Sequence, residues 1–200
     1  MINTFDKNYY KNSNGIKIEY GIKYGNENVL FIKTGLNGSI NGYNDKYLKM
    51  IEYINYKYGW TIFIVSNPEG SSNDLELDLK VLWDLFPNNN MKLNYMGVSN
   101  GGLIGIQQGY KYNIDKMVCV NMPLMFNFHR TKKGIEQSNY ERLTIIYGEN
   151  DQSYPYIPLI KNYISKKIGI KVYKNQDHFF SYNDIDFFEI PIKYIIDLKD

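Results

Sequence analysis

The chain has 200 residues, a length typical of one domain with a sizeable hydrophobic core. Its formal net charge is +2 and its lysines are spread along the sequence, so we expect no nucleic-acid partner. The N-terminus lacks a signal peptide's basic and apolar segments, and no apolar run approaches about 18 residues, so we expect no membrane span and a cytoplasmic protein. The single cysteine, Cys119, excludes an internal disulfide, and its apolar surroundings favour a buried structural thiol.

The first elements in chain order indicate the antiparallel edge of a sheet, followed by buried strands. Two polar-faced strands are predicted over residues 16–20 and 21–24, next to Asn-Gly and Gly-Asn turn signals. Residues 29–32 and 60–65 form short continuous apolar runs, which are typical of strands buried on both faces. Between them, helical spacing of apolar residues predicts a helix that is capped by Asn44-Asp45 and ends at Gly59.

The alternation of strands and helices continues to the end of the chain. An apolar stripe predicts a helix over residues 75–86, and Pro191 opens a terminal helical segment. The remaining strands are expected over 91–96, 116–120, 143–147 and 170–173, with a helix over 156–168. This order predicts an α/β fold: one domain over residues 1–200, with a doubly wound, mostly parallel sheet, helices on both faces and three layers.

One strand-to-helix connection carries the segment Gly97-Val98-Ser99-Asn100-Gly101, a G-x-S-x-G match. A serine in such a turn projects its hydroxyl above the sheet, and the two glycines let strand and helix cross closely. The same match also arises by chance at ordinary turns. A catalytic interpretation therefore requires a base and an acid elsewhere in the chain.

A carboxylate and a histidine follow two later strands. Asp151 lies after the strand over 143–147, and His178 lies after the strand over 170–173. Because parallel strands end at the same rim of a sheet, we expect both side chains near Ser99. A serine hydroxyl needs an imidazole to take its proton, and the imidazole needs a carboxylate to fix its tautomer. The sequence thus predicts a triad of Ser99, Asp151 and His178.

Other residues could take these roles. His129 is the second histidine of the chain, and its polar neighbours favour a surface position. The competing carboxylates are Glu149, Asp177, Asp184 and Asp186. Two histidines in separate segments and one distant cysteine offer no credible zinc site, so no metal is expected.

The three motifs together resemble the serine-hydrolase branch of the α/β-hydrolase superfamily. Residues 97–101 are similar to its nucleophile elbow, 148–151 to its acid loop and 177–180 to its histidine loop, and the resemblance runs from about residue 16 to the C-terminus. In the family's acid loop, the third position after the glycine, here Asp151, fits the acid. Residues 34–38 resemble the family's His-Gly oxyanion loop, although Thr34 stands where histidine is common.

The resemblance implies a small esterase or thioesterase that forms an acyl-enzyme on Ser99. The backbone N–H groups of Asn100 and Leu36 would hold the oxyanion, and no cofactor is implied. Only about 20 residues separate the strands on either side of the usual lid position, too few for a separate cap domain, so an open site is expected. Its substrate would be a small-molecule or carrier-linked acyl compound.

Two points stay open at this stage. The apolar segment 122–126 either contacts the acyl group or packs into the core, and methionines suit an adaptable surface. The same fold also occurs in non-catalytic binding proteins, and an acyltransferase would use the same triad.

Overall fold

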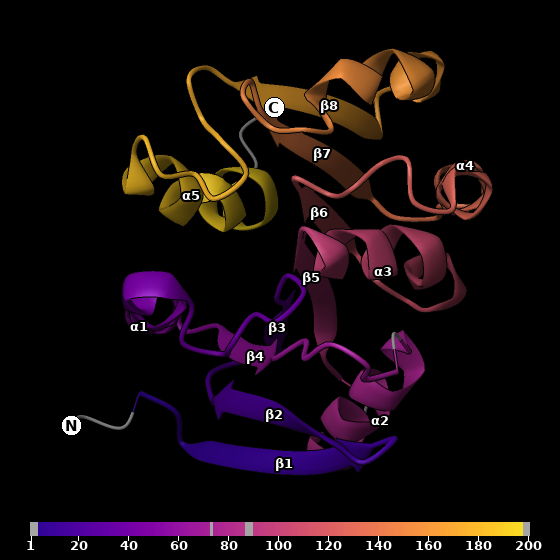
Figure 1. The fold of residues 1–200 in the computed structure, drawn as a ribbon. Coiled ribbons are helices and arrows are strands. Elements are labelled where there is room, and N and C mark those ends of the chain that lie inside the picture. The colour runs from indigo at the N-terminus through magenta and orange to yellow at the C-terminus, as the bar shows by residue number, and fades with distance from the viewer. Residues whose placement is uncertain (1–3, 73, 87–89, 198–200) are drawn as a thin grey trace.

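The structure, a computed structural model, describes residues 4–72, 74–86 and 90–197. In these residues eight strands form one sheet in the order β1-β2-β4-β3-β5-β6-β7-β8 (Figure 1). The strands are β1 Lys7–Ser13, β2 Ile16–Lys23, β3 Asn28–Lys33, β4 Thr61–Val65, β5 Lys92–Val98, β6 Lys116–Val120, β7 Arg142–Gly148 and β8 Ile168–Tyr173. β2 pairs antiparallel with β1 on one side and with β4 on the other. From β4 the sheet continues through β3, β5, β6 and β7 to β8, and all of these pairings are parallel.

Helices cover both faces of this sheet. They are α1 Lys46–Tyr58, α2 Leu75–Leu85, α3 Asn100–Gln108, α4 Phe128–Glu136 and α5 Asp184–Pro191, with the short segments η1 Tyr43–Asp45, η2 Gly109–Lys111, η3 Tyr154–Tyr163 and η4 Ile192–Ile196. α1 and α5 lie on one face, and α2, α3 and α4 lie on the other (Figure 1). The predicted doubly wound, three-layer arrangement is confirmed. None of the helices described is long and apolar enough to cross a membrane.

Two apolar layers explain the continuous hydrophobic runs of the central strands. Phe31 and Phe63 face the α2–α3 side, where their rings meet edge to face at 5.2 Å. Ile32 and Ile64 face the α1–α5 side. All four side chains are buried, because each strand is covered by helices on both faces.

The antiparallel edge differs from the sequence prediction. β2 runs without a break through Gly21, and β1 is an additional strand joined to it by a turn in which Asn14 and Gly15 have φ angles of 54° and 79°. Asn-Gly suits such a two-residue hairpin turn. A side chain at position 21 would collide with the Phe5 ring, so Gly21 permits a close contact within the strand and does not end it.

Three helix predictions also need correction. Asp45 adopts a left-handed conformation with φ 57° and its side chain makes no capping bond, although α1 does end at Gly59 as predicted. Residues 154–163 form a 3₁₀ segment instead of an α-helix over 156–168, since Pro158 inside it has no N–H to donate. Pro191 is the last residue of α5, and the helical segment η4 follows it directly, so Pro191 lies within a helical stretch that begins earlier than predicted. α5 begins after Asn183, whose side chain accepts a bond from the Ile185 N–H.

Candidate active site

Ser99 lies at the rim of the sheet, in the sharp turn from β5 to α3. Its backbone angles are φ 51° and ψ −119°, which are rare for a residue with a side chain. The turn is held on both sides, because the Ser99 N–H donates to the Val120 carbonyl at 2.7 Å and the Ser99 carbonyl accepts from the Leu103 N–H. The strained turn leaves the side chain partly exposed.

The two glycines that flank Ser99 allow three backbone segments to meet. A Cβ at Gly97 would lie 2.5 Å from the Gly101 carbonyl oxygen, and a Cβ at Gly101 would overlap the Lys33 carbonyl at the end of β3. Any larger residue would push α3 away from β5 or β3. Their spacing in the sequence therefore reflects the close crossing that a nucleophile elbow requires.

The structure brings Ser99, His178 and Asp151 together in one hydrogen-bonded row. His178 Nε2 lies 3.0 Å from Ser99 Oγ, and His178 Nδ1 lies 2.5 Å from Asp151 Oδ2. The Asp151 side chain is fully buried, whereas 34% of the His178 side chain is exposed. The second carboxylate oxygen of Asp151 accepts the Ser153 N–H at 2.7 Å, which fixes its orientation. A buried carboxylate thus orients a partly exposed imidazole toward the hydroxyl.

The carboxylates nearest in sequence to Asp151 and His178 have other partners. Glu149 Oε2 accepts the Asn175 N–H at 3.0 Å and so joins the loops after β7 and β8. Asp177 accepts the N–H groups of Phe179 and Ser181. Partial burial acts to raise the pKa of Asp177, but the hydrogen bonds outweigh it and lower this pKa below its usual value.

The remaining competitors also lie outside the row. Asp186 accepts Gln176 Nε2 at 2.7 Å, and Asp184 is the first residue of α5. His129 is exposed on α4, the surface position expected from its neighbours.

Asn121 ties the loops of Asp151 and His178 to each other, a role that the sequence reasoning missed. Its buried side chain donates from Nδ2 to the His178 carbonyl at 2.9 Å and to the Asp177 carbonyl at 3.1 Å. Its Oδ1 accepts the Gly148 N–H at 2.8 Å. The one available signal was an asparagine directly after the apolar strand that ends at Val120.

The loop after β3 lies against Ser99. A Cβ built on Gly35 would lie 3.2 Å from the Ser99 Cβ. In this loop the N–H groups of Thr34, Asn37 and Gly38 donate to backbone carbonyls. Within the described part of the chain, by contrast, no protein acceptor is found for the N–H groups of Leu36 and Asn100. Two backbone donors therefore remain available at this edge of the turn.

Thr34 stands where the family that this chain resembles commonly has histidine, and its side chain forms a hydrogen bond within the loop. Its buried hydroxyl lies 3.0 Å from the Gly38 carbonyl oxygen and 3.2 Å from that of Val65. The Gly38 N–H in turn donates to Gly35. The threonine thus supports the loop conformation through its hydroxyl.

Asn67, which follows β4, connects this loop to α3. Its Nδ2 donates to Asn100 Oδ1 at 2.9 Å and to the Thr34 carbonyl at 3.2 Å. Its backbone N–H donates to Gly38, and its carbonyl accepts from Asn37. The residue is fully buried. Like Asn121, it was not identified from the sequence.

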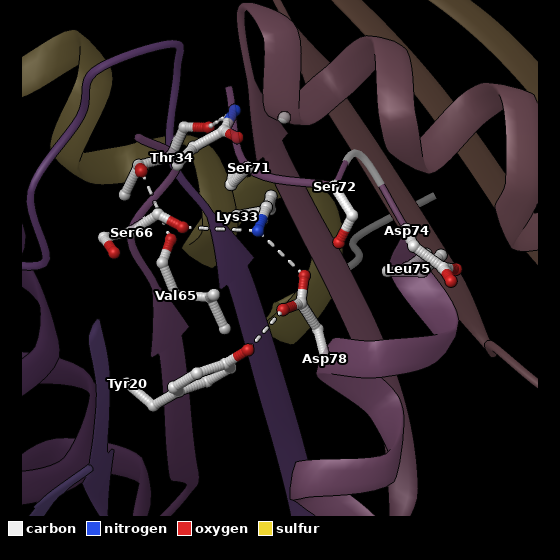
Figure 2. A network of polar contacts seen from close by, with 12 residues as sticks. Tyr20, Lys33, Thr34, Val65, Ser66, Ser71, Ser72, Asp74, Leu75 and Asp78 are labelled. Atoms are coloured by element: carbon white, nitrogen blue, oxygen red, sulfur yellow. Dashed lines mark hydrogen bonds and ion pairs between the residues drawn. The ribbon is translucent and has the colours of Figure 1, made fainter. Parts of the chain in front are cut away.

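A buried ion pair supports the same loop from below (Figure 2). Lys33 Nζ lies 2.8 Å from Asp78 Oδ2 and donates to the Ser66 carbonyl at 3.2 Å. The Tyr20 hydroxyl donates to Asp78 Oδ1 at 3.0 Å. Burial raises the pKa of Asp78, while Lys33 and Tyr20 act to lower it. The network links α2 to the ends of β3 and β4.

The segment 122–126 combines the two alternatives that the sequence left open. Met122 and Leu124 are fully buried in the α2–α3 layer of the core. Met125 and Phe126 are exposed, by 49% and 68% respectively. Only the second half of the segment is therefore available to a ligand.

In the residues that the structure describes, no group of three or more His, Cys, Asp or Glu side chains gathers in an arrangement suited to a metal ion.

No protein-family model and no curated protein matches the sequence. Several solved structures resemble the fold across nearly the whole chain. Est1E from Butyrivibrio proteoclasticus matches with a TM-score of 0.72 and 12% identity, over 92% of this chain and 95% of that one. XC6422 from Xanthomonas campestris, described as an α/β serine hydrolase without a lid, matches with a TM-score of 0.68 and 14% identity, over 96% and 94%.

A third similar structure is the esterase domain of a protein from Rhodothermus marinus, with a TM-score of 0.65 and 12% identity, over 90% of this chain and 92% of that one. The chain therefore has the α/β-hydrolase fold, and the resemblance to α/β serine hydrolases that its motifs indicated is confirmed at the level of the fold.

Proposed function

We propose that the protein is a serine hydrolase that cleaves a carboxylic ester or thioester. The observation that carries the proposal is the row Ser99 Oγ, His178 Nε2 and Nδ1, and Asp151 Oδ2, with distances of 3.0 and 2.5 Å. It supplies a nucleophile, a base and an orienting carboxylate at the rim where ligands reach an open α/β sheet. Similar structures named as a serine hydrolase and an esterase support this assignment.

In the first half-reaction, His178 Nε2 accepts the hydroxyl proton while Ser99 Oγ forms a bond to the acyl carbon. Asp151 holds the Nδ1–H tautomer and stabilises the imidazolium. When the bond from the acyl carbon to the leaving oxygen or sulfur breaks, His178 gives the proton to the leaving group. The products of this step are an alcohol or thiol and an acyl group on Ser99.

In the second half-reaction, His178 accepts a proton from water while the water oxygen attacks the acyl carbon. The bond to Ser99 Oγ breaks, and His178 returns the proton to the serine. The carboxylic acid leaves and the hydroxyl is restored. An acceptor alcohol or amine in place of water would make the same site an acyltransferase.

The N–H groups of Leu36 and Asn100 would stabilise the negative charge that develops on the acyl oxygen. Each donor of this kind contributes on the order of 3 kcal/mol to transition-state stabilisation. None of these steps requires a metal or cofactor. The chain would act as one domain without a separate cap. Residues 121–141 would only connect β6 to β7.

The test of the proposal is labelling with a fluorophosphonate, which reacts with activated serines, together with turnover of a short-chain aryl ester. We expect Ser99→Ala to lose both labelling and turnover while keeping its thermal unfolding midpoint. Ser165→Ala is the matched control, because Ser165 is exposed and precedes β8 at the opposite end of the strands. Substantial turnover by Ser99→Ala would exclude Ser99 as the nucleophile, and unlabelled wild-type protein would favour a non-catalytic binding role.

A further inference from the structure

A cavity of about 550 Å³ lies beside the loop that carries His178, outside the row of Ser99, His178 and Asp151. One wall comes from η1 and the start of α1, with Tyr43, Lys46 and Lys49. The opposite wall comes from the β8–α5 loop and α5, with Phe179, Asp184 and Phe187. α1 and α5 lie next to each other on the same face of the sheet (Figure 1).

Phe179 connects this cavity to the proposed chemistry. It directly follows His178, and the two rings meet edge to face with centroids 5.3 Å apart. In the proposed reaction, His178 Nε2 must reach the leaving oxygen or sulfur in order to protonate it. The leaving group must therefore lie next to the imidazole, and Phe179 both contacts that imidazole and lines the cavity.

The walls of the cavity offer aromatic surface to a ligand. Phe179 is 71% exposed and Tyr43 is 80% exposed, so both rings face solvent in the free protein. Exposed aromatic rings bury apolar surface when a flat apolar group packs against them. Phe187 lies deeper in the wall, where it packs against Tyr47 and Phe180.

Lys46 gives the aromatic cavity a positive charge. Its Nζ lies 4.3 Å over the Phe187 ring and 3.5 Å from the Phe179 carbonyl oxygen. Burial lowers the pKa of Lys46, although Asp184 and Asp177 act to raise it. No carboxylate forms an ion pair with this ammonium among residues 4–72, 74–86 and 90–197. With Lys49 on the same wall, the cavity is lined by two lysines and by one acidic residue, Asp184.

We propose that this cavity is the leaving-group subsite, and that it accepts an aromatic leaving group carrying a carboxylate. The ring would lie between Phe179 and Tyr43, and the carboxylate would pair with the Lys46 ammonium. This inference rests on the proposed hydrolase function and names the substrate class of the same site.

The test compares 3-carboxyphenyl acetate with 3-carbamoylphenyl acetate, which share the acyl group and the ring but differ in charge. The readout is the kcat/KM for 3-carboxyphenyl acetate divided by the kcat/KM for 3-carbamoylphenyl acetate. Effects common to both esters cancel in this ratio. We expect Lys46→Gln to lower this ratio by roughly threefold to tenfold, the range for a partly buried ion pair. Lys49 lies at an exposed position on the same wall. If Lys46→Gln does not fold, the same ratio is measured in Lys49→Gln.

Lys57→Gln is the matched control, because it removes the same charge from the far end of α1, outside this cavity. Its ratio should equal that of the wild type. An equal reduction in Lys57→Gln would mean that the net charge of the protein decides the preference. An unchanged ratio in both Lys46→Gln and Lys49→Gln would overturn the proposal.

A binding experiment separates this proposal from the proposed function. We expect 3-hydroxybenzoate, the leaving group itself, to shift the backbone amide resonances of residues 43–49 and 179–188 in Ser99→Ala protein, and 3-hydroxybenzamide to bind more weakly. Such shifts, combined with a wild-type protein that hydrolyses no ester, would overturn the hydrolase function and leave the cavity as an anion site. Turnover of simple esters without these shifts would overturn the subsite alone.

Discussion

The side-chain amide of Asn67 donates to Asn100 Oδ1 at 2.9 Å, so a buried residue after β4 holds the residue that follows Ser99. The same Nδ2 donates to the Thr34 carbonyl at the start of the loop that carries Leu36. Leu36 and Asn100 are the two proposed oxyanion donors. Asn67 therefore fixes the spacing between them without touching the substrate, which makes it a positioning residue.

We expect Asn67→Ala to lower kcat by roughly tenfold to a hundredfold, somewhat less than the loss of an oxyanion donor itself, with a smaller change in KM. Asn100→Ala removes the acceptor Oδ1 and keeps the backbone N–H, so the two substitutions form a double-mutant cycle. Non-additive effects on kcat, measured well below the unfolding temperature, would support positioning. Additive effects, or a lower unfolding temperature with unchanged kcat, would contradict it.

The second prediction concerns the choice between two neighbouring carboxylates. Asp151→Asn should lower kcat by about 10⁴-fold, since the imidazole loses the partner that fixes its tautomer. Glu149→Gln should have little effect, because Glu149 Oε2 accepts the Asn175 N–H and does not contact His178. Steady-state rates on one aryl ester measure both. The reverse ranking would assign the acid to Glu149.

The candidate site was largely predictable because its three motifs are local. A G-x-S-x-G turn, a carboxylate after one strand and a histidine after another can each be recognised from a few residues, and the parallel sheet places them at one rim. Asn67 and Asn121 act across the fold instead. The bonds from Asn67 to Asn100 and from Asn121 to His178 span 33 and 57 residues, and no local pattern distinguishes such asparagines from those in ordinary loops.

The strands of the fold could be predicted from the sequence where helices cover both of their faces. β3 and β4 are covered on both faces and show as continuous apolar runs, whereas β1 lies at the edge and is almost entirely exposed, so it carries no hydrophobic pattern. The segment at Tyr154–Tyr163 has helical spacing of isoleucines, but Pro158 prevents regular α-helical hydrogen bonds. At Asn44 and Asp45 the backbone is left-handed, with φ angles of 51° and 57°, and the Asp45 side chain makes no capping bond.

The third prediction is the pH dependence of the reaction. The proposed base accepts a proton only when it is neutral, so kcat/KM should be low in acid and should rise as the pH increases. Addition of a chelator should leave the curve unchanged. The measurement uses a neutral ester whose own ionisation does not change. A flat profile from about pH 5 to 9 would remove His178 from the mechanism.

The fourth prediction concerns Cys119, which is fully buried in β6. Burial raises the pKa of its thiol well above the usual value, so almost no thiolate forms near neutral pH. We expect iodoacetamide at pH 8 to leave the native protein unmodified and to alkylate it once in denaturant, as measured by intact mass. Rapid stoichiometric alkylation of the native state would show that this thiol is accessible.

The last prediction concerns the buried pair of Lys33 and Asp78 beneath the loop after β3 (Figure 2). Lys33→Met would leave the Asp78 carboxylate buried without its ammonium, and the loss of one partner of such a pair costs about 3–5 kcal/mol. The double variant Lys33→Met/Asp78→Leu removes both charges and should recover most of this loss in urea unfolding experiments.

Glu76→Gln provides the control, because it breaks the exposed pair with Lys80 on the same helix as Asp78 and should leave the unfolding midpoint unchanged. Lys33 Nζ also donates to the carbonyl of Ser66, the residue before Asn67. The double variant should therefore regain stability but have a lower kcat than the wild type, because the hydrogen bond from Lys33 Nζ to the Ser66 carbonyl is lost. A double variant as unstable as Lys33→Met would show that the cost arises from altered packing and not from the unpaired charge.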